Sequence, residues 1–410
     1  MTEFGVLPLG WETHALGDLL SLQNGVNADR AAYGAGTPFI NVLEVITKGW
    51  LTVGNIPGRV ALTPEVVEAF AVRDGDVLFN RTSETQEEVG LASVYSGTAT
   101  VVFGGFVIRG RPRTELLDSR FASYSLRSPT IRRQIVARGQ GAVRANIGQG
   151  ELSRVKVVVP PRAEQEAIAG ALSDADALIA SLEQLLAKKR HLKQGAMQEL
   201  LTGKKRLPGF TGKWIVARLD ELGRWTGGMT PSMANPGYWQ GGAVPWISSA
   251  DVKTARLAAT ASAITDLAVK QKATTVLPAK SVIVVTRSGI LRKYLPVAMN
   301  VIPMAINQDI KALVPNERVL PEYLLHSLTY HGERILARCL KSGTTVESIE
   351  FPWLKAFTIP VPALAEQEAI AEVLSDMDAE IVALEGKLTK ARQIKQGMMQ
   401  ELLTGRIRLV

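Results

Sequence analysis

The sequence predicts an α/β (α+β) protein. Two globular domains are separated by two long helices whose apolar stripes can pair, and the whole is an internal repeat. Three observations predict this architecture. A long segment occurs twice, apolar residues recur at coiled-coil spacing in both copies, and short apolar runs bounded by turn residues fill the chain between them.

The repeated segment runs from Glu164 to Leu207 and again from Glu366 to Leu409. The offset is constant at 366 − 164 = 202 residues, and direct counting gives 29 identities among the 44 aligned positions. A repeat of this length indicates two large units rather than a solenoid of small ones.

Both copies are predicted to be helical, because their apolar residues step by 4 and 3 in alternation. From Ala163 to Thr202 such a helix would be about 60 Å long at 1.5 Å per residue. It cannot bury its own apolar stripe, so the two stripes either pair with each other, leaving apolar surface for a partner, or pack on their own domains. The predicted pairing residues are Ile168, Leu172, Ile179, Leu182 and Leu186 in the first copy and Ile370, Leu374, Met377, Ile381, Leu384 and Leu388 in the second.

Two further features of the helices carry expectations. Glu164 and Glu366 fall in the first turns, where the helix dipole favours negative charge. Gly195 and Gly397 weaken the helices at matched points, which a close helix crossing would explain.

The composition restricts the class of protein. Lys and Arg number 47 against 39 Asp and Glu, a net charge of +8 that favours a polyanionic partner such as nucleic acid. The single cysteine, Cys339, excludes a disulfide framework and favours a reducing, cytoplasmic location. No apolar run is long enough for a membrane span, and the N-terminal residues do not resemble a signal peptide.

Four segments are predicted. Residues 1–161 form the first globular domain and 162–203 the central helix; residues 204–362 form a linker and the second globular domain, and 363–410 the C-terminal helix. One helix is expected over Ser119–Arg138 and another over Pro321–Leu340, each followed by a polar loop, Gly139–Gly150 and Gly343–Ile349 respectively. The cations of Lys204–Arg206 are interpreted as a solvated linker or as phosphate contacts.

No catalytic or metal-binding constellation is found. There is no phosphate-binding loop, the histidines are scattered, and His326 and His331 are too far apart in register for a metal pair. The paired carboxylates Asp174 and Asp176, like Glu164 and Glu166, are better explained by the helix dipole than by acid/base catalysis.

Binding chemistry remains. Loop arginines flanked by small hydroxyl residues can bond base edges or hold phosphates, and aromatic residues in polar loops can stack on bases. Each such residue alone is as well explained as ordinary loop surface, but the set recurs in both units. The candidates are Tyr33, Arg81, Thr82, Ser83, Arg144, Asn146 and Gln149 in the first domain and Tyr238, Trp239, Arg287 and Ser288 in the second.

Two divergent domains, each followed by a Glu-Gln-x-x-Ile helix that ends in Lys-Gln-Gly-x-Met-Gln-Glu-Leu-Leu-Thr-Gly, resemble the specificity subunit of a type I restriction-modification enzyme. The resemblance covers essentially the whole chain. It implies that each domain is a target recognition domain that reads one half of a split, asymmetric site on double-stranded DNA. It also implies that the two helices form an antiparallel coiled coil, in a pseudo-twofold arrangement. This coiled coil would set the half-site separation and dock two methyltransferase subunits, through which restriction (motor and nuclease) subunits join.

The resemblance further implies that the chain has no catalytic activity and binds no cofactor. S-adenosylmethionine, ATP and Mg²⁺ would be used by the partner subunits. Two other classes stay open on the residues alone: a coiled-coil scaffold that bridges two proteins without touching DNA, and a nuclease or methylase that acts by itself.

Overall fold

The structure, a computed structural model, describes residues 7–141, 144–341 and 345–409. Parts of the predicted loops Gly139–Gly150 and Gly343–Ile349, and the first six residues, lie outside the described residues. The chain divides into two compact units. Unit 1 comprises Met1–Glu183 and Gly386–Val410, and unit 2 comprises Gln184–Glu385. Each unit therefore takes part of both long helices.

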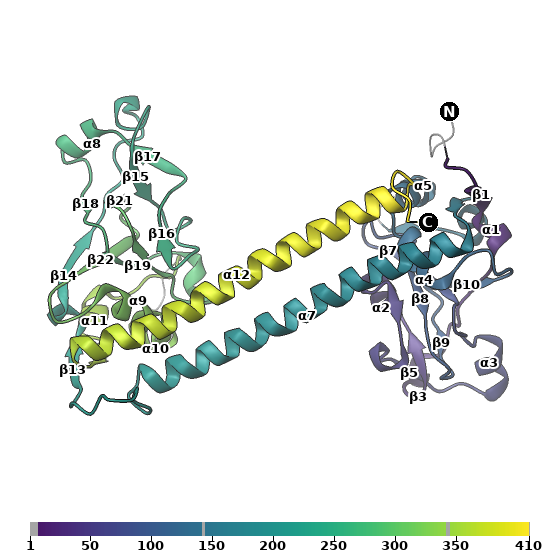
Figure 1. Cartoon of the computed structure of the whole chain (residues 1–410), viewed down its shortest axis with the longest axis horizontal. Coiled ribbons are helices and arrows are strands. Elements are labelled where there is room, and N and C mark those ends of the chain that lie inside the picture. Colours follow the sequence, from purple (N-terminus) through teal and green to yellow (C-terminus); the bar gives the residue numbers. More distant parts are fainter. Residues whose placement is uncertain (1–6, 142–143, 342–344, 410) are drawn as a thin grey trace. The chain divides into compact units, whose positions relative to one another are not determined.

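Unit 1 is built on a five-stranded sheet in the order β2-β10-β6-β8-β4, with a separate three-stranded sheet β5-β3-β9 (Figure 1). Its strands are β1 (Glu12–Ala15), β2 (Leu20–Asn24), β3 (Tyr33–Ile40), β4 (Trp50–Leu51), β5 (Arg59–Val60), β6 (Val77–Asn80), β7 (Thr82–Ser83), β8 (Ala92–Tyr95), β9 (Val102–Phe103), β10 (Val107–Pro112), β11 (Ala145–Asn146) and β12 (Lys156–Val159). Its short helices are α1 (Leu16–Leu19), α2 (Val42–Thr47), α3 (Pro64–Ala69), α4 (Ser119–Ser125), α5 (Pro129–Arg138) and α6 (Gln149–Ser153).

Unit 2 has a five-stranded sheet in the order β14-β22-β19-β20-β16 and a four-stranded sheet β17-β15-β21-β18. Its strands are β13 (Ile215–Arg218), β14 (Gly223–Gly227), β15 (Val244–Ile247), β16 (Arg256–Leu257), β17 (Ser262–Ile264), β18 (Val276–Leu277), β19 (Val282–Val285), β20 (Val297–Asn300), β21 (Met304–Ile306), β22 (Ile310–Pro315) and β23 (Thr358–Val361). Its short helices are α8 (Asp266–Lys270), α9 (Pro321–Tyr330), α10 (Gly332–Cys339) and α11 (Phe351–Lys355).

The two five-stranded sheets share one topology, and their middle strands β6 and β19 are buried at every position. Three of the four residues of β6 are apolar, and all four residues of β19 are apolar. This is expected for strands that are covered on both faces. The apolar runs that predicted strands are strands. The predicted α/β fold class is confirmed.

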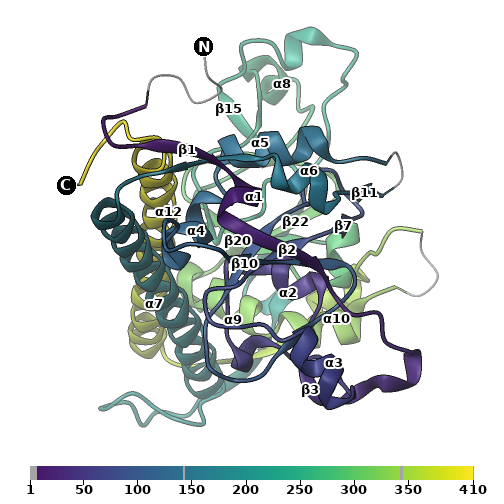
Figure 2. The same cartoon turned by 90° about the vertical axis from the view of Figure 1, so that its right-hand side faces the viewer.

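The long helices are α7 (Arg162–Leu200) and α12 (Leu364–Leu402). A matched glycine follows the last turn of each helix: Gly203 with φ of 71° after α7, and Gly405 with φ of 72° after α12. Both have the left-handed conformation that glycine adopts without strain. Within unit 1, the start of α7 lies beside the end of α12, as Figures 1 and 2 show.

Cross-helix ion pairs show that the segments are antiparallel in each unit, because partner numbers fall on α12 as they rise on α7. In unit 1 the pairs are Glu164–Arg408, Asp176–Lys395 and Glu183–Arg392. In unit 2 they are Lys189–Glu380, Lys193–Asp378 and Arg206–Glu366.

The apolar stripes of the helices pack both on their own domains and on the opposite helix, so both alternatives that the sequence left open occur. Ile168 and Leu172 belong to the core of unit 1, together with Leu402 from the end of α12. Ile370 and Leu374 belong to the core of unit 2, together with Met197 and other residues from the end of α7. The first turns of each helix thus pack on their own domain and on the opposite helix at once. Farther along, Leu186, Leu384 and Leu388 are buried, whereas Ile179, Leu182, Met377 and Ile381 are partly exposed.

A buried carboxylate ties the end of α12 to unit 1. Glu164 is fully buried and accepts hydrogen bonds from the Trp11 indole at 2.8 Å and from Arg408 Nη2 at 2.7 Å. Burial raises the pKa of Glu164, but the hydrogen bonds from Arg408 and Trp11 together outweigh it, so the pKa lies below its usual value. The contacts with Trp11 and Arg408 give glutamate a role here in addition to its first-turn position.

The same arrangement closes unit 2 with different chain segments. Glu366 accepts from the Trp214 indole at 3.0 Å and from Arg206 Nη2 at 2.6 Å. The Arg206 guanidinium also lies over the Trp214 ring, 5.4 Å from its centroid. Arg206 is therefore engaged within unit 2, which corrects the interpretation of Lys204–Arg206 as simply solvated or phosphate-binding.

The glutamine that follows each glutamate joins the helix to its domain. The Gln165 carbonyl oxygen accepts from the backbone N–H of Asp118, the residue that caps α4, at 2.8 Å. Its amide donates to the carbonyls of Leu116 and Pro160 at 2.7 and 2.8 Å. Gln367 makes the equivalent set in unit 2, with Leu320, Arg318 and Pro362. The repeated Glu-Gln pair is thus explained by structure.

A second repeated carboxylate, Asp176 in unit 1 and Asp378 in unit 2, contacts a short helix of its domain and the opposite long helix. In unit 1, Asp176 accepts from the Tyr124 hydroxyl at 2.9 Å and from Lys395 Nζ at 2.5 Å. In unit 2, Asp378 pairs with Lys193, and His326 stands where unit 1 has tyrosine, with its Nδ1 3.9 Å from Asp378. Burial, followed by the charge of Lys193, lowers the pKa of His326 to about 4.

Two expectations from the sequence are wrong. The predicted helix over Ser119–Arg138 is broken between α4 and α5, because Pro129 starts a new helix at its first position. The predicted helix over Pro321–Leu340 is likewise two helices, which meet at His331. In addition, a side chain at Gly195 or Gly397 would meet nothing within 4 Å, so no close helix crossing explains these glycines. No helix of the described residues is both long and apolar enough to cross a bilayer.

Candidate nucleic-acid interface

The middle strand of each five-stranded sheet leads into a polar loop that lines an open hollow. In unit 1 this hollow, called hollow 1, has a volume of about 410 Å³. It is lined by Val42, Leu43, Ile46, Thr82, Ser83, Glu84, Glu88, Phe106 and Arg144. The structure therefore brings together two stretches that the sequence analysis singled out separately, Arg81–Ser83 and the loop after Gly139.

Hollow 1 is held in shape by a short ladder. β7 pairs antiparallel with β11, so that Thr82 faces Asn146 and Ser83 faces Ala145. The Thr82 hydroxyl donates to the Asn146 side-chain oxygen at 2.6 Å, and the Asn146 amide donates to the Arg144 carbonyl at 3.1 Å. These contacts fix the loop while the Arg144 side chain remains exposed.

Hollow 2, the counterpart in unit 2, has a volume of about 530 Å³ and follows β19. It is lined by Thr286, Arg287, Gln308, Lys341, Thr345, Val346, Ser348 and Ile349. Arg287 forms an antiparallel bridge with Ser348, and the N–H of Ile349 donates to the Thr286 carbonyl at 2.8 Å. The cations Arg287 and Lys341 make hollow 2 rich in hydrogen-bond donors.

The two loop arginines do not occupy the same position. The N–H of Ile147 donates to the Arg81 carbonyl at 3.0 Å, just as Ile349 donates to Thr286. Arg81 is therefore equivalent to Thr286, and Thr82 to Arg287. The Arg81 guanidinium makes a long contact of 3.4 Å with the Gly105 carbonyl, whereas Arg287 is exposed. The two loop segments are equivalent, but their arginines are one position apart. Because neighbouring residues on a strand point to opposite sides, Arg81 and Arg287 point to opposite sides of these segments.

The hydroxyls beside the arginines serve the fold. Ser83 is buried, and its hydroxyl donates to Glu88 at 3.0 Å. The Ser288 hydroxyl accepts from the N–H of Ile290 and so caps a short 3₁₀ turn, Gly289–Arg292. The Ser83 O–H is therefore already used as a donor, whereas the Ser288 hydroxyl only accepts and keeps its O–H donor.

The remaining candidates lie away from the two hollows. Tyr33 starts β3 and is 44% exposed, with its ring 5.3 Å from that of Phe39. Gln149 lies on α6; with its amide oriented to satisfy both groups, it bonds the backbone of Leu22 and Asn24 at 3.1 Å. Its role is to hold α6 on β2.

The aromatic pair of unit 2 packs beside the four-stranded sheet. The Tyr238 hydroxyl donates to Gln271 at 2.6 Å, and the Trp239 indole donates to the Ser232 carbonyl at 3.2 Å. The Trp239 ring meets the Trp246 ring edge-on, 5.2 Å between centroids. These contacts support the second sheet, and the structure does not bring the pair to Arg287.

Sequence reasoning missed Gln308 and Lys341. The backbone pairing reveals Lys341, whose N–H donates to the Ser348 carbonyl at 2.9 Å as Gln140 does to Asn146 in unit 1. Gln308 is found because it lines hollow 2. A pairing of this kind leaves no mark in sequence spacing. Among the described residues there is no group of three or more His, Cys, Asp or Glu side chains placed to hold a metal ion.

The model for the type I restriction modification DNA specificity domain matches residues 8–188 and again residues 211–395. The chain belongs to this family. Each match contains one five-stranded sheet with its hollow. Each of the two matches also ends inside one copy of the repeated segment, 164–207 or 366–409.

Curated relatives point the same way. The chain is 37% identical over 184 residues to the Escherichia coli EcoR124I/EcoR124II specificity subunit, a match over 45% of this chain and 43% of that protein. It is 25% identical over 427 residues to the MjaX specificity subunit of Methanocaldococcus jannaschii, a match over 100% of this chain and 96% of that protein. The chain thus spans less than half of the first relative and nearly all of the second.

A solved structure of the S subunit of a type I restriction-modification system from M. genitalium shares the fold. Its TM-score is 0.61 at 15% identity, and the match covers 98% of this chain and 99% of that chain. A chain from a study of complex assembly and conformational transition of the type I system gives a TM-score of 0.58 at 18% identity, over 98% of this chain and 100% of that chain.

Proposed function

We propose that this chain is a non-catalytic specificity subunit that binds duplex DNA and reads a bipartite, asymmetric site, one half with each unit. The observation that carries the proposal is that the two hollows have equivalent backbone pairing but are lined by different side chains. Hollows 1 and 2 follow equivalent strands, yet their exposed residues differ in charge and hydrogen-bonding type. Two equivalent frames with different chemistry suit two different half-sequences.

The lining residues fit base and phosphate recognition. Arginine and lysine suit guanine edges or phosphates, glutamine suits adenine, and a carboxylate accepts from the amino group of cytosine. Hollow 2 offers Arg287, Lys341 and Gln308. Hollow 1 offers Arg144 beside the carboxylate of Glu84. The net charge of +8 adds a sequence-independent attraction to the DNA backbone.

The partners and cofactors follow from the same proposal. Two methyltransferase subunits would dock on the paired helices and use S-adenosylmethionine. Restriction subunits would join through them and use ATP and Mg²⁺. Support comes from partly exposed apolar residues on the helices, such as Leu178, which is 54% exposed, and Val382, which is 65% exposed.

Selection of bound duplexes from a random library tests the proposal, using the full chain together with its methyltransferase subunits. We expect recovery of one split motif with two unlike halves separated by unread positions. Exchange of residues 7–161 for those of a relative with a different target should change one half only. Recovery of no motif, or methylation by the isolated chain, would refute the proposal.

The same measurement separates the alternatives. A scaffold that only bridges proteins would assemble with its partners yet recover no enriched sequence. A chain that acts alone would turn over without the methyltransferase subunits. Assembly should therefore be recorded by size-exclusion chromatography in parallel with the selection.

A further inference from the structure

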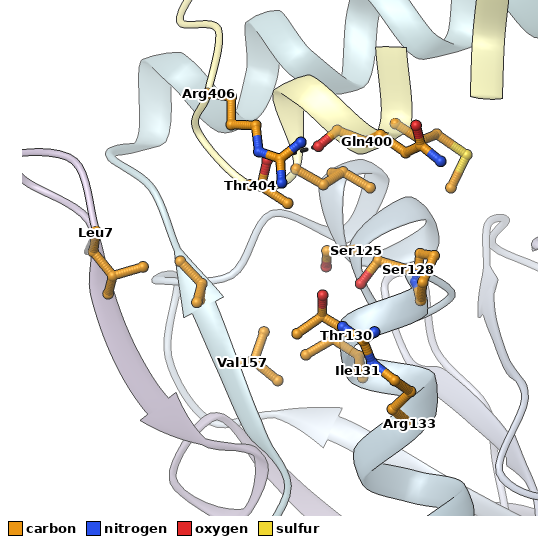
Figure 3. A pocket seen from close by; sticks show the side chains of 14 residues that line it. Leu7, Ser125, Ser128, Thr130, Ile131, Arg133, Val157, Gln400, Thr404 and Arg406 are labelled. Atoms are coloured by element: carbon orange, nitrogen blue, oxygen red, sulfur yellow. Dashed lines mark hydrogen bonds between the residues drawn. The ribbon is translucent and has the colours of Figure 1, made fainter. Parts of the chain in front are cut away.

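A second kind of cavity lies in unit 1, away from hollow 1. It has a volume of about 660 Å³ and is enclosed by α5, β12 and the end of α12 (Figure 3). We call it the serine pocket. Its lining comprises Leu7, Ser125, Ser128, Pro129, Thr130, Ile131, Arg133, Val157, Val158, Met399, Gln400, Leu403, Thr404 and Arg406.

The pocket holds a buried hydroxyl without a partner. Ser125 is 5% exposed, and no hydrogen bond to its Oγ is found among the described residues. Figure 3 shows this oxygen directed into the pocket, with the hydroxyls of Ser128 and Thr130 turned toward the same space. An unpaired buried hydroxyl destabilises the fold, which favours a ligand that accepts its hydrogen bond.

The start of α5 points at the same space. Ser128 is the N-cap residue and is 8% exposed, yet its side chain makes no capping hydrogen bond. Pro129 has no N–H, and the N–H groups of Thr130 and Ile131, in the first turn, have no acceptor within the helix. The positive end of the helix dipole and these two N–H groups favour an anion.

Two arginines complete the positive lining. Arg133 and Arg406 lie on opposite sides of the pocket in Figure 3. Arg406 contacts Glu401 at 3.5 Å, but both side chains are exposed, so this ion pair is weak and leaves the guanidinium available.

The opposing end of α12 adds little negative charge, because its last carbonyls are occupied. The Gln400 carbonyl accepts from the Thr404 hydroxyl at 2.6 Å, and the Leu402 carbonyl accepts from the N–H of Gly405 at 3.3 Å. The remainder of the lining is apolar and includes Val157, Met399 and Leu403.

Unit 2 does not repeat this lining. Ser327 matches Ser125 and also lacks a partner for its hydroxyl, but it is completely buried. Tyr330, His331 and Gly332 stand where unit 1 has Ser128, Pro129 and Thr130. An unpaired serine alone therefore does not define a site. What distinguishes unit 1 is that the serine lines a cavity together with a helix start and two arginines.

We propose that the serine pocket binds the phosphate group of a small phosphate monoester, with the apolar wall contacting the rest of the molecule. The volume is within the range of small-ligand sites, about 300–1,000 Å³. Ser125 and Ser128 are more than nine-tenths buried, so only a group that enters the pocket reaches them, which a duplex backbone does not. The proposal is independent of DNA reading by the hollows.

Titration calorimetry on the full chain tests the proposal with three probes: inorganic phosphate, adenosine 5′-monophosphate and adenosine. We expect phosphate and the monophosphate to bind, the monophosphate more tightly, and adenosine not to bind. Arg133→Gln should weaken phosphate binding by about tenfold, since a charge-assisted hydrogen bond is lost. Ser125→Ala should weaken it several-fold without lowering the melting temperature.

Ser327→Ala is the matched control, because it removes the same unpaired hydroxyl from unit 2. It should leave phosphate binding unchanged. The proposal is overturned if phosphate and the monophosphate do not bind, if adenosine binds as well as the monophosphate, or if Ser327→Ala weakens binding as much as Ser125→Ala. It is also overturned if a 30-base-pair duplex alone binds in a manner that Arg133→Gln abolishes.

Discussion

The contacts that close the two units use the same residues, whereas the hollows use different ones. Glu164 and Glu366 bind a tryptophan and an arginine in each unit, and Asp176 and Asp378 each bind a lysine from the opposite helix. The hollows that follow β6 and β19 share backbone pairing and little else. The 29 identities of the repeat are therefore concentrated at positions where a long helix contacts both its own domain and the opposite helix.

Exposed helix positions are less alike than the internal ones. Leu178 matches Glu380, and Leu185 matches Lys387, and all four are exposed. Sequence identity between the helices therefore reflects internal contacts more directly than two equal docking faces. Partner docking remains part of the proposed function, but it does not by itself explain the repeat.

The largest expected effect tests whether the contacts between the long helices and the domains stabilise the two units equally. Leu172 and Leu374 are matched and fully buried. Replacing either with alanine should cost its own unit about 2–5 kcal/mol, because each change leaves a cavity in an apolar core. Hydrogen exchange read on peptides of each unit measures the loss. A large loss in one unit with almost none in the other would contradict the equivalence.

The next effect distinguishes the units by pH. Burial lowers the pKa of His326 to about 4, with Lys193 adding and Asp378 opposing, and burial lowers the pKa of His331 to about 4 as well. Since the folded pKa of His326 lies below the unfolded value, its neutral form stabilises unit 2 fully above about pH 6.5. That contribution, on the order of 3 kcal/mol, is lost as pH falls toward 4.

Unit 1 has Tyr124 and Pro129 at the matched positions, so it should lose less stability over this window. Hydrogen exchange at pH 5 and pH 7.5 checks the difference. His326→Gln should reduce the pH dependence of unit 2 alone. Equal acid sensitivity of the two units would count against the assignment.

A smaller effect tests the inequality of the hollows. Arg287 is exposed in hollow 2, whereas Arg81 contacts the Gly105 carbonyl and does not line hollow 1. Arg287→Ala should weaken specific DNA binding by about 10–100-fold, equivalent to about 1–3 kcal/mol for one base contact, and relax selection at one half-site. Arg81→Ala should do less. Lys253→Ala, an exposed cation of unit 2 outside the hollow, is the control.

The smallest effect concerns the cross-helix ion pairs. Asp176 and Asp378 are 44% and 33% exposed, so each pair with its lysine should be worth only about 0.2–1 kcal/mol. Double-mutant cycles on Asp176 with Lys395 and on Asp378 with Lys193 should give similar coupling energies. A coupling several times larger in one unit would show that Tyr124 or His326 changes the clamp.

Much of the fold was predictable because it depends on local sequence patterns. The repeat, the heptad spacing of Ile168 and Leu172, and the apolar run of β6 each depend on near neighbours in the chain. The breaks at Pro129 and His331 were missed because the flanking residues favour helix and only the local turn interrupts it. Proline at a first helical position was the available signal for one of them.

The site was less predictable, because its geometry depends on distant pairing. That Thr82, and not Arg81, is equivalent to Arg287 follows only from the bridges to Asn146 and Ser348. The partner of Arg206 is Glu366, 160 residues away, so its charge looked free in the linker. Sequence identified the right loops and could not assign their side chains.

The division of the chain has a consequence for its biosynthesis. Unit 2 is one continuous stretch, Gln184–Glu385, whereas unit 1 needs Gly386–Val410 in addition to Met1–Glu183. A nascent chain leaving the ribosome therefore carries every residue of its second unit before the last residues of its first. Unit 1 is begun first and completed last, and until Leu402 has been synthesised the apolar surface that it covers stays open to chaperones.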